Sequence, residues 1–532
     1  MTAARNKAIL QTITLLTTIL SLSFPAYAKY GGGTGEPNNP YLIYTAEQLN
    51  TIGLNQEDAD KHFKLMADID LSAYHGDSFN RIGFYDPPEF APDWHPPFSG
   101  VFDGNNHTIS NFTYVVDVNV PLKENGLWGD ECVGLFGIVG GMHAQIKNLG
   151  LIDPNIYPAM TCTERVASVG AIAGKLSMGS ITNCYVEGGR ISADNAVGGL
   201  VGSNSGGNIS NCHTTCCIAW AKGRWLRPLD LPFELNPVSF GGLAGFNSGQ
   251  IYDCYSTGSI QGYNSSGGLI GHNYRDAYDP NLECGVISDC YATGDVSGNE
   301  YVGGLAGESN GEISLCFAVG NVSGLNNVGG LVGIIGFDEG IISCSYSISN
   351  VSGNERSGGL VGYSNGSIQQ SFAVSEVSGT VYVGGLVGFN GSGTIHNSYS
   401  WGSVKGSENV GALSGRNGNG SIYCCYAANA VNTIAGSEYV GGLLGSNISG
   451  MVSACFWNIE TSGLLEMCGL HYGDGGCDNE YGKTTIEMQT TSTFLDSGWD
   501  FANETENGTD DIWWIDEGQD YPRLWWELNP DE

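Results

Sequence analysis

Basic residues are scarce in this sequence. Its 532 residues include 20 Lys and Arg against 55 Asp and Glu, which gives a formal net charge of −35 at pH 7. A surface of this sign repels the phosphate backbone of DNA or RNA. The composition therefore argues against a nucleic-acid-binding protein.

Long apolar runs are also scarce, and the clearest one lies at the N-terminus. Two basic residues precede an apolar stretch from Ala8 to Leu22, and the small residues Ala26 and Ala28 follow it. This order is typical of a secretory signal peptide over residues 1–28. A membrane anchor is the alternative, but Gln and Thr residues dilute the run. We expect an exported protein, extracellular, at the cell surface or periplasmic, with no membrane span after signal cleavage.

Catalytic and metal-binding motifs are missing. The chain has no His-Glu-x-x-His and no paired Cys-x-x-Cys spacing, so we predict no zinc site. Calcium on acidic turns stays open as a cofactor, although the EF-hand loop and the glycine-rich nonapeptide are absent. The best carboxylates for a polysaccharide-processing enzyme are Asp68, Asp70 and Asp103, the last near His107. Ordinary turn chemistry explains Asp103 to His107 as well, so we predict no enzymatic activity.

Glycine, in contrast, is abundant at 81 residues, and much of it recurs in one block. Residues 198–202 read Gly-Gly-Leu-Val-Gly, and eleven such blocks run from Gly134 to Gly445, often 26 to 30 residues apart. Each unit carries three short apolar segments that are too short for helices. Repeats of this length are typical of a parallel β-solenoid, whereas a propeller blade needs about 40–45 residues.

The sequence therefore predicts an all-β fold, a right-handed parallel β-helix (β-solenoid) of roughly ten or more coils with N- and C-terminal caps. We place the N-terminal cap and first irregular coils at 29–132, the solenoid at 133–457 and an aromatic-rich C-terminal cap at 458–532. Thr45 to Gly53 has the signals of a short helix. Six of the eleven Trp residues lie between 457 and 526. They favour a hydrophobic plug over the last coil, with a carbohydrate platform as the alternative.

The blocks, followed by an Ile-x-x-Cys-Tyr segment, resemble the GLUG repeat of bacterial exported and surface proteins. Residues 35–49 resemble the leader module that precedes such repeats, and Phe98 to Ile109 resembles its first coil. The resemblance covers nearly all of residues 31–532. It implies a surface β-solenoid of the kind found in adhesins and in the non-catalytic part of some secreted immunoglobulin-A metallopeptidases. It implies no peptidase activity here, because the metal-binding motif is absent.

Cysteines recur in register with the blocks, mostly nine to eleven residues after the last glycine, and an aromatic residue usually follows. Alternation along a strand places the two side chains on opposite faces. We interpret the cysteines as an interior structural ladder of small buried side chains. Its predicted members are Cys184, Cys212, Cys254, Cys290, Cys316, Cys344, Cys425 and Cys455.

Export would favour disulfides instead, but neighbouring in-register strands give poor geometry for a bridge. Two pairs off the ladder are better candidates. Cys468 and Cys477 flank a glycine-rich loop, and Cys132 with Cys162 is a second candidate pair. We expect the glycines of the blocks to adopt positive φ angles or to allow close packing of one backbone against another.

The longest insertion lies between Gly202 and Gly245 and carries aromatic and basic residues. Such a set suits sugars, carboxylates or a partner protein, although a loop with its tryptophans buried on the flank is the alternative. We predict ligand binding by Trp220, Lys222, Arg224, Trp225 and Arg227.

We therefore expect a monomeric, adhesin-like interaction module that binds an extracellular glycan or a surface protein. Its contacts would be multivalent and non-catalytic, along a rigid flank and through insertion loops. The alternatives are a polysaccharide-degrading β-helix enzyme, either a lyase or a glycoside hydrolase, and a purely structural surface spacer.

Overall fold

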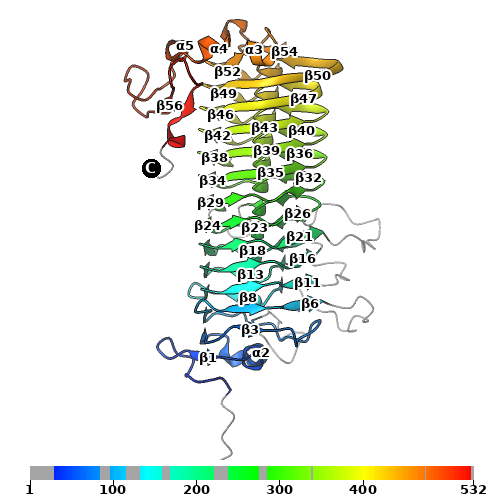
Figure 1. Cartoon of the computed structure of the whole chain (residues 1–532), viewed down its shortest axis with the longest axis vertical. Helices are drawn as coiled ribbons and strands as arrows, with labels where there is room; N and C mark the ends of the chain where they lie inside the picture. The colour runs from blue at the N-terminus through cyan, green and yellow to red at the C-terminus, as the bar shows by residue number, and fades with distance from the viewer. Residues whose placement is uncertain are drawn as a thin grey trace, which may run out of the picture.

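The chain forms a parallel β-helix whose coils stack along one long axis (Figure 1). A computed structural model describes residues 29–83, 96–115, 132–157, 168–193, 195–220, 238–274, 284–336, 340–473 and 475–528. The coils build three long parallel sheets of 14, 29 and 12 strands. The predicted all-β parallel β-helix is confirmed, and its right-handedness stays a prediction.

The coils stack in strict register. In the 14-stranded sheet, β14 (Ser180–Thr182), β19 (Asn208–Ser210) and β24 (Gln250–Tyr252) pair so that Ile181, Ile209 and Ile251 lie directly above one another. All three isoleucines are buried. Because side chains alternate along a strand, each sheet sends one such column into the interior and another outward.

Close backbone packing explains the glycine blocks. A Cβ added at Gly199 would lie 2.1 Å from the carbonyl oxygen of Gly242, and one at Gly202 would lie 2.3 Å from the backbone nitrogen of Val169. Neither glycine has a positive φ. Positive φ angles fall instead on residues such as Asn183 (52°) before the cysteine positions. Of the two roles expected for the block glycines, close packing is the one that applies.

The interior ladder satisfies backbone donors as well as filling space. The backbone N–H of Cys184 donates to the Sγ of Cys212, and that of Cys212 donates to the Sγ of Cys254, both at 3.4 Å. At Cys316 the acceptor is the hydroxyl of Ser345, at 3.1 Å. A small side chain that accepts a hydrogen bond is needed there, which explains why serine replaces cysteine in some coils. The buried ladder cysteines are Cys184, Cys212, Cys254, Cys290, Cys316, Cys425 and Cys455.

Cys344 was assigned wrongly to this ladder. Its φ is 46° and it is only partly buried, whereas Ser345 is fully buried in the ladder position. The interval from Gly333 to Gly362 is longer than the basic repeat. In this coil the ladder position therefore lies twelve residues after the last glycine of the block, and not nine to eleven as predicted. Cys344 therefore occupies the turn position that Asn183 occupies in its own coil.

The structure joins Cys468 and Cys477 by a disulfide with a Cα–Cα distance of 6.0 Å. This is the pair that flanks the glycine-rich loop. Cys162, the proposed partner of Cys132, lies outside the described residues.

Outward-facing rings form a second ladder on the 29-stranded sheet. Successive rings stack with centroids 4.7 to 5.2 Å apart and interplanar angles of 1° to 9°. Because the ring faces cover one another, the ladder presents ring edges to its surroundings. Its stacked members are Tyr185, His213, Tyr255, Tyr291, Phe317, Tyr346, Phe372, Tyr399 and Tyr426.

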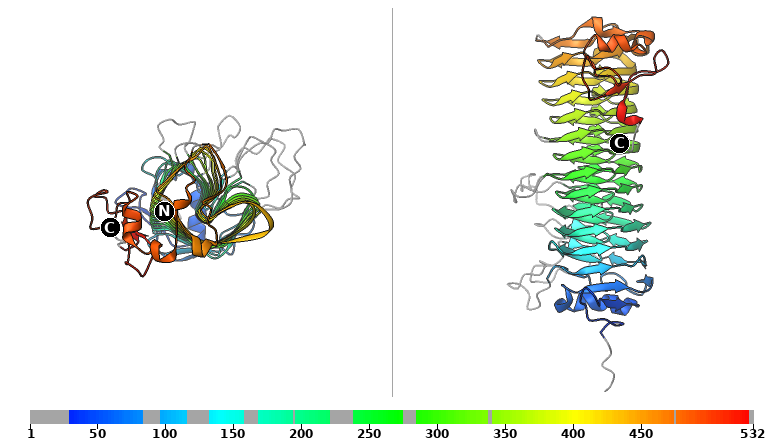
Figure 2. Two further views of the ribbon diagram at one scale, coloured as in Figure 1. Left: turned by 90° about the horizontal axis from the view of Figure 1, so that it is seen from above. Right: turned by 90° about the vertical axis from the view of Figure 1, so that its left-hand side faces the viewer.

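Residues 484–528 pack against these ring edges and not over the last coil. This segment, the lateral strap, contains α4 (Thr485–Met488), α5 (Thr491–Leu495), β56 (Trp513–Trp514) and β57 (Arg523–Leu524). Figure 2 shows it outside the ring of coils. Trp499 and Trp513 lie 6.4 and 6.1 Å from Tyr426, ring centroid to ring centroid.

The predicted plug is therefore wrong for the strap tryptophans, because the ladder offers them a large apolar surface. Trp457, in contrast, does lie in the interior of the β-helix, at its C-terminal end.

The coils also extend beyond the predicted solenoid of 133–457. At the N-terminal end, β1 (Tyr41–Ile43) pairs with β2 (His62–Leu65), and β2 pairs with β4 (Val101–Asp103). At the other end, β54 (Cys468–Tyr472) pairs with β51 (Leu444–Ile448). The N-terminal coils fall within 29–132, where irregular coils were expected, whereas the coil that contains β54 lies in the predicted C-terminal cap and lacks the glycine block. Helix α2 (Ala46–Leu54) begins after Thr45, whose side chain accepts from the backbone N–H of Gln48.

A buried asparagine ladder was not predicted. Asn204 donates to Asn247 and Asn247 donates to Asn273, each at 2.8 Å. Near the C-terminal end, Asn390 donates to Asn417 at 2.9 Å and Asn417 donates to Asn447 at 3.0 Å. Each of these residues follows the last glycine of a block by two positions, so the recurrence of asparagine at this position could have predicted the ladder. The ladder ties consecutive coils together inside the turn.

We expect Asn417→Ala to destabilise the fold. It removes the side chain between Asn390 and Asn447 and leaves buried polar groups without partners, which costs about 1–3 kcal/mol. Urea unfolding followed by circular dichroism measures the loss. Asn432→Ala, at an exposed position, is the matched control. Equal unfolding midpoints for the two variants would contradict a stabilising ladder.

Trp513→Ala is expected to release the strap from the coils. Trp513 is fully buried against Tyr399 and Tyr426, and loss of a buried Trp side chain costs about 3–5 kcal/mol. Hydrogen exchange should then speed up across residues 484–528 while the 14-stranded sheet stays protected. Trp525→Ala, at a half-buried position, is the control, and unchanged strap protection in Trp513→Ala would refute the docking.

Candidate ligand-binding flank

Five consecutive coils build one polar flank of the helix. Its strands are β11 (Asn155–Tyr157), β16 (Arg190–Ala193), β21 (Cys217–Trp220), β26 (Ile260–Gln261) and β31 (Val296–Ser297). They pair in parallel, and Asn155, Arg190 and Cys217 lie in one column. Outward side chains from separate coils therefore stand side by side.

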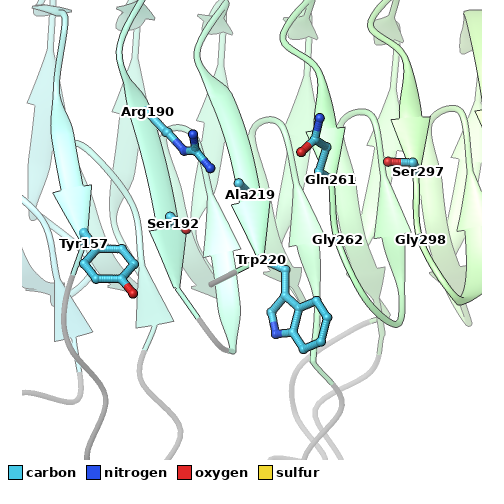
Figure 3. A pocket seen from close by; sticks show the side chains of 9 residues that line it. All are labelled: Tyr157, Arg190, Ser192, Ala219, Trp220, Gln261, Gly262, Ser297 and Gly298. Carbon is cyan, nitrogen blue, oxygen red and sulfur yellow. The ribbon is translucent and has the colours of Figure 1, made fainter. Parts of the chain in front are cut away.

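These strands enclose an open hollow of about 610 Å³ (Figure 3). An aromatic ring, a guanidinium, an amide and hydroxyls line it, and none of its lining residues within the described ranges is acidic. A site of this size and composition has room for a small polar ligand or a segment of a polymer. The lining residues are Tyr157, Arg190, Ser192, Ala219, Trp220, Gln261, Gly262, Ser297 and Gly298.

Trp220 and Arg190 are the residues best placed to contact a ligand. The Trp220 ring stacks on Tyr263 with centroids 4.6 Å apart, which holds it at the edge of the hollow. Its buried indole Nε1 has no hydrogen-bond partner among the described residues. Arg190 is exposed and forms no ion pair within the same part of the chain. The hollow thus offers a fixed ring and a positive charge.

The structure describes only one of the five predicted binding residues, and ligand binding by all five stays a prediction. Trp220 packs partly against the interior cluster, as expected for a tryptophan buried on the flank, and it also lines the hollow, where a ligand could contact it. Lys222, Arg224, Trp225 and Arg227 lie outside the described residues. Sequence reasoning missed Arg190 and Tyr157, although aligning outward positions coil by coil would have placed them beside Trp220.

The carboxylates considered for catalysis serve turns. Asp68 accepts from the backbone N–H of Thr108 at 2.9 Å and lies 3.1 Å from His107 Nδ1, and the first contact is the main reason that its pKa is lowered. The pKa of Asp70 is lowered chiefly by a hydrogen bond from Asn111. Asp103 accepts from the backbone N–H of Asn105 at 2.9 Å. Lowered pKa values keep Asp68 and Asp70 ionised, which does not suit a general acid.

The described ranges contain neither a metal cluster nor a membrane-spanning helix. No three His, Cys, Asp or Glu side chains there are grouped closely enough to hold a metal ion. No helix in that part of the chain is long and apolar enough to cross a bilayer.

Comparisons with known proteins identify the repeat. The family model of the GLUG motif matches residues 193–215 and 262–297. The chain is 32% identical over 192 residues to a protein of Evansella cellulosilytica described as a candidate Gly-rich membrane protein, and 29% identical over 165 residues to halomucin of Haloquadratum walsbyi. These matches cover 33% and 31% of this chain, but only 19% and 2% of the two relatives.

A solved structure was also matched, that of a candidate immunoglobulin A1 protease from Bacteroides ovatus. The match covers 94% of this chain and 96% of that one, at 17% identity and a TM-score of 0.26. This score is too low to support any conclusion about activity. The two GLUG segments, in contrast, contain the glycine blocks at 198–202 and 267–271, so this chain carries the GLUG motif at these two places of the β-helix.

Proposed function

We propose that this protein is an exported, surface-located, adhesin-like module that binds an extracellular glycan without chemical turnover. The observation that carries the proposal is the hollow on the flank, which Trp220, Arg190 and Gln261 line from three coils. A rigid ring, a guanidinium and an amide are groups that commonly hold sugars in place. The names of the two relatives, a Gly-rich membrane protein and a halomucin, agree with a location at the cell surface.

The lining of the hollow favours binding over catalysis. Glycosidases need two carboxyl groups at opposite sides of the scissile bond, and lyases need a base beside the sugar ring. Among the described residues, those lining the hollow include no Asp, Glu or His. Asp68, Asp70 and Asp103 are engaged in turns, as described above. We therefore propose a non-catalytic role, with the chain acting as a monomer.

A rigid stack of coils also suits multivalent binding. Each strand repeats at about 4.8 Å along the axis, so a polymer that lies along the flank meets a new row of side chains at every coil. Individual contacts can then be weak while retention of the polymer is strong. The outward residues differ from coil to coil, and we propose that they select where along the rod a glycan is held.

The test is retention of the protein on a panel of soluble polysaccharides. In affinity electrophoresis with dextran, xyloglucan or arabinogalactan in the gel, we expect slower migration for the wild type. Trp220→Ala should weaken binding about tenfold, because a ring that packs against a ligand contributes more than 1 kcal/mol.

The matched control is Tyr252→Ala, which removes an exposed ring from the 14-stranded sheet. Arg190→Gln should weaken binding less than Trp220→Ala for neutral polymers, because its charge has no counterpart there. Equal retention of the wild type and Trp220→Ala would refute binding at the hollow.

A further inference from the structure

A cluster of two arginines and three aromatic rings lies four to six coils further along the helix than Trp220. Arg356 belongs to β40 (Glu355–Gly358) and Arg416 to β48 (Ser414–Asn417). The guanidinium carbons of Arg356 and Arg416 lie 5.9 and 5.1 Å from the ring centroid of Phe389 in β45 (Val387–Asn390). Tyr363 and Tyr382 flank the same two guanidiniums at 5.5 and 5.7 Å.

The rings hold both guanidiniums in fixed positions. Arg356 donates to Asn327 at 3.3 Å and pairs with Glu355 at 2.9 Å. Arg416 donates to the hydroxyl of Tyr382 at 3.3 Å. The side chain of Arg356 retains 33% of its exposure, and Arg416 is also half-buried, so part of each residue faces solvent, although the Nε atom of each is buried. A guanidinium that is already ordered loses little entropy when it binds an anion.

The charges in this cluster are not balanced. Arg416 has no carboxylate partner in the described ranges, and its buried Nε makes no hydrogen bond there. The missing partner of Arg416 is notable because the chain has 55 acidic residues that could pair with an arginine. Two like charges on one ring repel each other, and Glu355 neutralises only one of them. An anion bound beside either guanidinium would offset part of that positive charge.

We propose that Arg356 and Arg416 form a subsite for an acidic sugar, one that carries a carboxylate or a sulfate on an otherwise neutral glycan. The guanidinium edges bind the anion, and the adjacent Tyr and Phe rings contact the sugar. The net charge of −35 repels each negative charge of a ligand, so the repulsion is greater for a polyanion than for a sugar with a single charge, although salt screens it beyond about 8 Å. The subsite rests on the proposed glycan binding and specifies which sugar the rod selects.

Calorimetric titration with matched sugars tests the subsite. The probes are 3′-sialyllactose against lactose for the carboxylate, and galactose 6-sulfate against galactose for the sulfate, all at 0.15 M salt. We expect at least one acidic sugar to bind at least about fivefold more tightly than its neutral counterpart, and the better one identifies the anion. Arg416→Gln and Arg356→Gln should each remove that preference. Lys405→Gln, which deletes an exposed charge elsewhere, should keep it.

A second measurement uses the unaltered protein, in case the arginine variants do not fold. Phenylglyoxal labels accessible guanidiniums, and mass spectrometry locates the labels. The acidic sugar should protect Arg356 and Arg416 while Arg190 stays labelled. Equal affinity for acidic and neutral sugars, or equal labelling with and without the acidic sugar, overturns the subsite.

The outcomes separate this proposal from the glycan-binding function itself. If Trp220→Ala loses retention on polysaccharides while the arginine variants keep the wild-type sugar preference, the subsite is wrong and the glycan-binding function stands. If wild-type protein is retained by no polysaccharide and binds no acidic sugar, both are wrong.

Discussion

The parallel pairing of each coil with the next is the interaction on which the rest of this structure depends. It requires backbones to approach closely at the same place in every layer, and at Gly199 or Gly202 a Cβ would collide with the neighbouring coil. Strict register then turns each position of the repeat into a column. Columns that face inward must satisfy their polar groups, and the cysteine or serine ladder and the asparagine ladder both do so.

Register also determines what the outer surface can do. Where outward residues are aromatic, they stack face to face and leave only ring edges, which the strap covers from Tyr346 onward through Trp526, Trp513 and Trp499. Where they are mixed and polar, as around Trp220 and Arg190, side chains from several coils converge on one hollow. The insertions and the non-repeating outward positions, and not the repeat itself, therefore carry the chemistry that we propose for recognition.

The fold could be predicted from the sequence because its signal is repeated, whereas the sites could not. Glycine spacing alone indicated the β-helix, and the alternation of cysteine and aromatic residues gave the two faces of one strand. The assignment of Cys344 to the interior ladder was wrong, because a longer coil places Ser345 at the ladder position. The strap was misplaced because its binding surface forms only after the coils stack. Arg190, Trp220 and Gln261 are far apart in sequence, and only the register brings them together.

The central claim is that this rod holds a glycan without altering it. Size-exclusion chromatography with light scattering, applied to a polysaccharide that the protein retains, tests it directly. The account predicts a complex in which the molar mass of the polysaccharide stays constant during prolonged incubation. A molar mass that falls with time would show chain cleavage and contradict the account, and so would the absence of any complex.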